Sequence, residues 1–247
     1  MHTDIALALA RLGDSTDRLL ATAGALDDAQ AAAASRLPGW TRGHILTHLA
    51  RNADGFRNLL IWARTGTETP MYPSEESRDR DIEAGARRPA VELTEDLRAS
   101  AAAFAVAAEE LPADAWDAAV ARRGDTFPAR VILPRRLSEL EIHHVDLGAG
   151  YGPGDWPADF VQITLARVAD DFAGLPGMPA ILARPDGQAA AFALGPAGGG
   201  AAGPGPASPV TVTGPPAALL AWLIGRGNGA GLEVPGGAAL PVLPPWR

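Results

Sequence analysis

The sequence contains no cysteine, so the chain has no disulfide bonds, no thiolate metal ligands and no thiol nucleophile of its own. Basic residues are also few, with 21 Lys and Arg against 29 Asp and Glu and a formal net charge of -8. Nucleic acid is therefore not expected as a partner, because phosphate binding requires a clustered basic face. The first residues, MHTDIALALARLGD, include acidic groups and no sustained apolar run, so we predict no secretory signal, no membrane span and a cytoplasmic location.

Hydrophobic residues make up 47% of the 247-residue chain, which is enough for one large core or two smaller ones. The composition changes along the chain. Up to about residue 174 the pattern is helical, and beyond residue 178 it consists of short apolar runs separated by turn residues. We therefore predict a mainly α protein, with a helical domain over 1–174 followed by a small α+β domain over 178–247.

Apolar residues at helical spacing define the elements expected in the first domain. Thr41 is a good N-cap residue, and Gly66 is suited to end the helix that begins there. Pro112 limits another helix at its C-terminal end. The predicted helices span residues 3–33, 41–65, 75–87, 90–110, 134–149 and 158–172.

The second domain begins with two apolar runs, AILAR and AAAFALG, on either side of a Pro-Asp-Gly sequence at 185–187, which indicates a β-hairpin. Residues 195–209 (GPAGGGAAGPGPASP) are predicted to be a flexible, low-complexity loop. A strand over 209–214 and a helix over 215–227 follow, and LEVPG at 232–236 is expected to add another strand. These elements account for the α+β assignment.

Two pairs of polar residues in the first domain have metal-ligand chemistry. His44 and His48 are four residues apart, as are Glu139 and His143, so each pair lies on one face of its predicted helix. Imidazole and carboxylate ligands without sulfur suit zinc or another first-row divalent ion, and three such ligands leave a position open for catalysis. His144 points about 100° away from His143 and does not join the same cluster. The residues alone also fit ordinary capping or solvent-facing side chains.

Three segments together resemble the mycothiol-dependent maleylpyruvate isomerase family. They are GWTRGHILTHLARNADGFRNLLIWARTG, TPMYPSEESRDRDIEAGA and RLSELEIHHVDLGAGYGPGDWP. The resemblance implies a DinB-like four-helix bundle that binds a divalent metal, usually zinc, followed by a smaller α/β domain. In the matching motifs, the positions of the family's metal ligands are occupied by His48, Glu139 and His143, so the resemblance implies these three as ligands and His44 as a neighbour of the site.

The resemblance also implies the reaction, and it explains how a chain without cysteine performs thiol chemistry. Mycothiol would supply the sulfur, the metal would acidify it, and the thiolate would add to the cis double bond of maleylpyruvate. Rotation and loss of the thiolate would give fumarylpyruvate. His48 and Arg226, the latter in IGRGNG, are implied as catalytic residues, and Arg226 would bind the dicarboxylate substrate from the smaller domain. A solvated arginine near a helix C-terminus is the alternative for Arg226.

Weaker signals lie close to these motifs. Asp146, one turn after His143, would suit an acceptor that orients the imidazole, although a surface carboxylate is equally consistent. Arg78, Arg80 and Asp81 would suit a hydroxyl-rich sugar-thiol, and a solvated polar helix explains them equally well. Tyr72 is a candidate hydrogen-bond donor at the cleft. Trp40 and Trp62 are expected in the core or beside a pocket.

Other functions would use the same metal ligands. A mycothiol-dependent transferase acting on another electrophile would consume the thiol, whereas an isomerase returns it. A metal-dependent hydrolase is a further alternative among enzymes, and a non-catalytic, metal-binding DinB-like module is the alternative from another class. The choice among them depends on substrate and metal content.

Overall fold

The computed structural model of the chain describes residues 2–196 and 209–246, so most of the predicted low-complexity loop lies outside the described residues. The chain forms two compact units that divide between Tyr151 and Gly152. The first unit is helical and the second combines helices with a small sheet, which confirms the predicted fold class.

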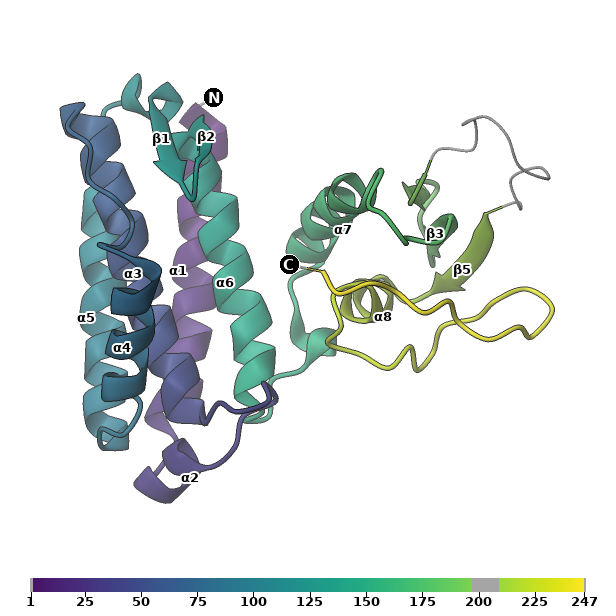
Figure 1. Cartoon of the computed structure of the whole chain (residues 1–247), viewed down its shortest axis with the longest axis horizontal. Coiled ribbons are helices and arrows are strands. Elements are labelled where there is room, and N and C mark those ends of the chain that lie inside the picture. The colour runs from purple at the N-terminus through teal and green to yellow at the C-terminus, as the bar shows by residue number, and fades with distance from the viewer. Residues whose placement is uncertain (1, 197–208, 247) are drawn as a thin grey trace. The chain divides into compact units, whose positions relative to one another are not determined.

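Four long helices form the first unit: α1 (His2–Gly24), α3 (Arg42–Thr65), α5 (Ala90–Glu109) and α6 (Ile132–Leu147). Helix α3 packs on α5 and α6, and α1 packs on the same two helices, so the four lie side by side around one core (Figure 1). The short helices α2 (Asp28–Ala32) and α4 (Glu75–Gly85) both pack against α3. The core is made of fully buried apolar side chains, among them Leu19, Ile45, Leu49, Phe56, Leu97 and Ile132.

The ends of α3 follow from local sequence chemistry. The Thr41 hydroxyl accepts a hydrogen bond from the backbone N–H of His44, and Gly66 ends the helix with a left-handed φ of 70°. Both features agree with the prediction. The predicted helix over 3–33 is instead interrupted after Gly24, because Asp27 and Gln30 form a capping box that starts α2.

A β-hairpin lies between α5 and α6, where the sequence analysis predicts no helix or strand. Strand β1 (Ala119–Arg122) pairs antiparallel with β2 (Asp125–Pro128), and the loop residues Arg123 and Gly124 have φ values of 51° and 86°. Positive φ at both central residues is the geometry of a type I′ turn, which matches the twist of the two strands. Strand β1 also packs against α3, which brings the hairpin next to the helix that carries His48.

The second unit contains α7 (Ala158–Phe172), α8 (Pro216–Leu223) and a three-stranded sheet. Strand β3 (Ile181–Pro185) lies between antiparallel β4 (Phe192–Leu194) and parallel β5 (Val210–Gly214), so the predicted hairpin and the strand after the loop are confirmed.

The division between the units lies earlier in the chain than residues 174–178, where the sequence placed it. Helix α7 packs on α8 and β4, so it belongs to the second unit although its composition resembles that of the bundle helices. LEVPG does not form the predicted strand, because among the described residues it contributes only an isolated bridge between Glu233 and Thr213. Within the described residues, the helices are too short or too polar to cross a membrane.

Candidate metal centre

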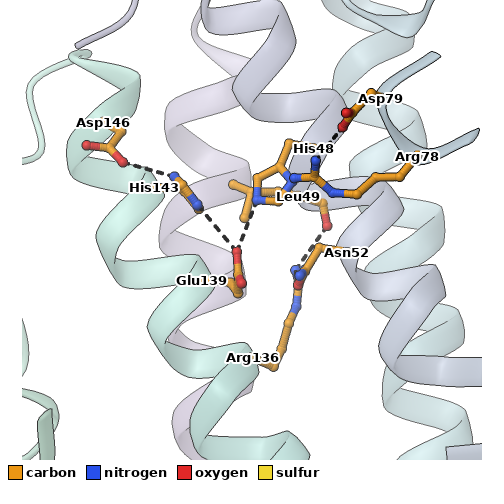
Figure 2. Close-up of polar contacts among 9 residues, drawn as sticks. All are labelled: His48, Leu49, Asn52, Arg78, Asp79, Arg136, Glu139, His143 and Asp146. Carbon is orange, nitrogen blue, oxygen red and sulfur yellow. Dashed lines mark hydrogen bonds and ion pairs between the residues drawn. The ribbon is translucent and has the colours of Figure 1, made fainter. Parts of the chain in front are cut away.

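Three side chains from two helices converge in the first unit. Helix α3 supplies His48, and α6 supplies Glu139 and His143 from successive turns of one face (Figure 2). Oε2 of Glu139 lies 3.0 Å from Nε2 of His48 and 3.3 Å from Nε2 of His143. All three ligand atoms lie within 4.8 Å of one another. The sequence-predicted triad is therefore brought together without any contribution from His44.

This arrangement fits a divalent metal ion. An ion bound at about 2.1 Å to nitrogen and oxygen ligands in tetrahedral geometry separates those ligand atoms by about 3.4 Å. The two separations to the Glu139 oxygen, 3.0 and 3.3 Å, are close to this value. Two imidazoles and one carboxylate are a donor set that suits zinc and other first-row divalent ions, and three protein ligands leave a fourth position open. Within the part of the chain that the structure describes, this is the one cluster of three such groups that could hold a metal ion.

His143 is oriented from its other nitrogen. Its Nδ1 lies 2.9 Å from Oδ2 of Asp146, whose side chain is only 2% exposed. An Nδ1–H that donates to a carboxylate fixes the ring and directs Nε2 toward the ligand cluster. Burial alone lowers the pKa of His143, but hydrogen bonds to Asp146 and Glu139 outweigh it and raise the pKa to about 9. Without a metal ion, His143 is therefore the charged imidazole of the pair.

His48 has a different environment. Burial, together with the charges of His143 and Arg78, lowers the pKa of His48 to about 4, although the hydrogen bond to Glu139 and the charge of Glu139 act in the opposite direction. Its Nδ1 lies 3.2 Å from Nη2 of Arg78 on α4, and the Trp40 ring is 5.6 Å from the imidazole ring. Trp40 therefore lies beside the metal ligand His48.

Glu139 accepts a hydrogen bond from each of the two imidazoles. Burial alone raises the pKa of Glu139, but the hydrogen bonds from His143 and His48 hold it well below the usual range. The carboxylate is thus ionised and acts as the common acceptor of the two rings. Negative charge at this position is also what a cationic metal requires of its ligand.

A buried arginine, Arg136, lies near Glu139 in the core of the first unit. Arg136, one turn earlier on α6, is only 2% exposed and donates from Nη1 to the Leu49 carbonyl oxygen at 3.0 Å and to Oδ1 of Asn52 at 2.7 Å (Figure 2). Burial lowers the pKa of Arg136 to about 10, while Glu139 acts in the opposite direction. Sequence reasoning missed Arg136, although its i, i+3 spacing from Glu139 placed it on the same helical face.

The other two histidines of the predicted motifs have separate roles. His44 closes the start of α3, since its Nδ1 lies 3.1 Å from the backbone nitrogen of Thr41, and its Nε2 lies 3.0 Å from Oε2 of Glu83. His144 is buried on a different face of α6, where Nε2 lies 2.7 Å from the Thr22 hydroxyl and the ring stacks on Tyr151. Neither imidazole joins the metal ligands.

Arg226 lies in the second unit, three residues after the end of α8. Its backbone N–H donates to the Ala221 carbonyl oxygen at 2.7 Å, and its Nη1 donates to the Ile224 carbonyl oxygen at 3.1 Å. The guanidinium thus closes the last turn of the helix, in keeping with a basic residue at a helix C-terminus. Its catalytic role stays a prediction.

Comparison with known proteins identifies the family. The mycothiol maleylpyruvate isomerase N-terminal domain matches residues 12–148, and the C-terminal domain of the same family matches residues 155–243. The chain belongs to the mycothiol maleylpyruvate isomerase family. The resemblance inferred from the sequence is therefore confirmed, and the two family domains meet at the division between the units.

Solved structures agree with this family membership. The crystal structure of a mycothiol-dependent maleylpyruvate isomerase is 30% identical and superposes with a TM-score of 0.88, covering 98% of this chain and 97% of that one. A histidine-to-alanine mutant of a mycothiol-dependent maleylpyruvate isomerase gives the same coverage and TM-score at 29% identity. A search of curated proteins gave no match. Similarity to the isomerases thus extends over both units of this family member.

Proposed function

We propose that this chain catalyses the mycothiol-dependent isomerisation of maleylpyruvate to fumarylpyruvate. The observation that supports this most directly is the cluster of His48, Glu139 and His143 in a chain that matches an isomerase of that name over nearly its whole length. Zinc is the metal we propose, because two imidazoles, one carboxylate and an open position suit a catalytic zinc site. The proposed substrate is a small dicarboxylate, and the proposed thiol is mycothiol.

The bound groups would supply what the side chains lack. The metal would lower the pKa of the mycothiol thiol and so supply a nucleophile for the cis double bond, which a chain without cysteine cannot supply itself. The chain's own residues prepare this chemistry. His48, Glu139 and His143 hold the ion, and Asp146 keeps the proton on Nδ1 of His143 so that Nε2 remains the ligand atom. We propose that Arg226 binds a substrate carboxylate or the developing enolate.

The first experiment is a direct assay of the proposed reaction. Conversion of maleylpyruvate is followed by absorbance with zinc-loaded protein, with and without mycothiol, for the wild type and for His48→Ala and Arg226→Ala. We expect conversion only with mycothiol, full recovery of the thiol, and strong loss in both variants. Consumption of the thiol would instead support the transferase, and absence of conversion by zinc-loaded protein would contradict the isomerase proposal.

A further inference from the structure

Three of the buried polar atoms without partners belong to residues whose charges or contacts reach the metal ligands or one another. They belong to Tyr72, which precedes α4, to Arg78 on α4, and to Arg122 at the end of β1. Among the residues that the structure describes, the Tyr72 hydroxyl and the Nε atoms of Arg78 and Arg122 are buried and have no hydrogen-bond partner. Buried donors are normally satisfied, so three unsatisfied donors near one another call for an acceptor from outside the chain.

These groups lie within electrostatic reach of one another and of the triad. The Arg78 guanidinium carbon is 5.9 Å from the centre of the Tyr72 ring. Burial, followed by the charge of Glu139, raises the pKa of Tyr72, and Arg78 and Arg122 act in the opposite direction. An acceptor bound at Tyr72 would therefore lie close to the Arg78 guanidinium and within the field of Arg122, and these charges favour an anion.

Arg78 presents its free edge to the site. Its Nη1 donates to Oδ1 of the exposed Asp79 at 2.6 Å, while Nε is unpartnered and Nη2 contacts Nδ1 of His48. Nε and Nη2 form the edge of a guanidinium that binds a carboxylate bidentately. Arg123 uses these same two atoms to hold the Glu75 carboxylate in this structure. Arg78 has the same edge, and no carboxylate of the described residues is bonded to it.

The contact between Arg78 and His48 is compatible with only one state of the imidazole. A guanidinium can only donate, so Nδ1 of His48 must accept and the ring proton must lie on Nε2, the atom that faces Glu139. Nη2 carries a second N–H, so this atom of Arg78 keeps a donor beside its contact with His48.

We propose that Arg78 and Tyr72 form a carboxylate-binding subsite beside the metal ligands. The substrate carboxylate would accept from Nε and Nη2 of Arg78 and from the Tyr72 hydroxyl. That the occupant is the substrate rests on the proposed isomerase function, whereas carboxylate binding itself rests on the side chains. The neighbouring Arg80 is exposed and provides a matched control on the same helix.

The experiment measures binding without turnover. Maleate, a cis dicarboxylate, is titrated calorimetrically into zinc-loaded protein in the absence of mycothiol, for the wild type, Arg78→Met, Arg78→Lys, Tyr72→Phe and the control Arg80→Met. Loss of a charge-assisted bidentate pair weakens binding about ten- to hundredfold, so we expect this effect for Arg78→Met and less than about twofold for Arg80→Met. Arg78→Lys keeps the charge but not the fork and should also bind weakly. Zinc content and melting temperature are measured for each variant.

Each outcome is decisive. Equal affinity of Arg78→Met and the wild type overturns the subsite, as does failure of zinc-loaded wild type to bind maleate. Loss of zinc from Arg78→Met would make Arg78 a support for His48 and would also overturn it. If maleate binding depends on Arg78 but maleylpyruvate is not isomerised, the subsite stands and the proposed reaction fails.

Discussion

Zinc binding to His48, Glu139 and His143 is expected to release about one proton per ion at pH 7. The pKa of His143 is raised to about 9, so its protonated form exceeds the neutral form by about 100 to 1 at pH 7. The pKa of His48 is lowered to about 4 and that of Glu139 lies well below its usual range, so at pH 7 His48 is already neutral and Glu139 already ionised, and neither adds to the release. A metal ion must displace the proton on Nε2 of His143 before that atom can ligate.

The same shift fixes the pH dependence of the affinity. Because the pKa of His143 is raised, protons compete with zinc below pH 9, and the apparent association constant rises about tenfold per pH unit between about pH 6 and 8. Above about pH 9 this dependence ends. Calorimetric titration of zinc in two buffers of different ionisation enthalpy measures the number of protons released directly.

A substitution at Asp146 tests the cause of the shift. Asp146→Asn removes the charge that holds the Nδ1 proton, so the pKa of His143 should fall and fewer protons should be released at pH 7. A complete return to the ordinary value of about 6.5 would leave about a quarter of a proton. Asp81→Asn removes an exposed carboxylate from α4 and serves as the control. Heats that are equal in the two buffers for the wild type, or release that is unchanged in Asp146→Asn, would refute the reasoning.

Three further predictions concern ligation and stability. His48→Ala should lose zinc, whereas His44→Ala should retain one ion per chain, as measured by elemental analysis after dialysis, because only His48 is part of the triad. Thr41→Ala should lower the free energy of unfolding by about 1 kcal/mol through loss of the α3 cap, without changing zinc content, and a shift of less than 0.3 kcal/mol would contradict the cap assignment. Phe56→Ala removes a fully buried ring from α3 and should cost about 3–5 kcal/mol in denaturant unfolding, while Val106→Ala at an exposed position should change stability by less than about 0.5 kcal/mol.

The predictable part of the site is the part encoded by local spacing. The i, i+4 spacing of Glu139 and His143 places both side chains on one face of a helix whatever the rest of the fold does. The choice of His48 over His44 as the third ligand could not come from spacing, because both lie on one face of α3. The choice of His48 depended on the family motif. The structure explains why His44 is not the ligand, because His44 caps the start of α3.

The unpredicted parts depend on contacts between distant segments. Arg136 reaches Leu49 and Asn52 on α3, and Arg78 reaches His48 from a different helix, so neither contact has a signature in the neighbouring sequence. The domain boundary was misplaced for a related reason. Helix α7 has the apolar pattern of a bundle helix, and only its packing on α8 and β4 assigns it to the second unit.

The charge arrangement explains how the ligands are held before an ion binds. Glu139 lies between His48 and His143 and accepts from both, so the carboxylate fixes the imidazoles at separations that suit a shared ion. The exchange at His143 replaces one proton by a divalent cation, which raises the local charge by one unit. Arg136 is already buried below Glu139, so the added positive charge favours an anion at the open coordination position. The thiolate and the dicarboxylate of the proposed reaction are both anions, and we therefore expect the centre to bind them more tightly after the exchange.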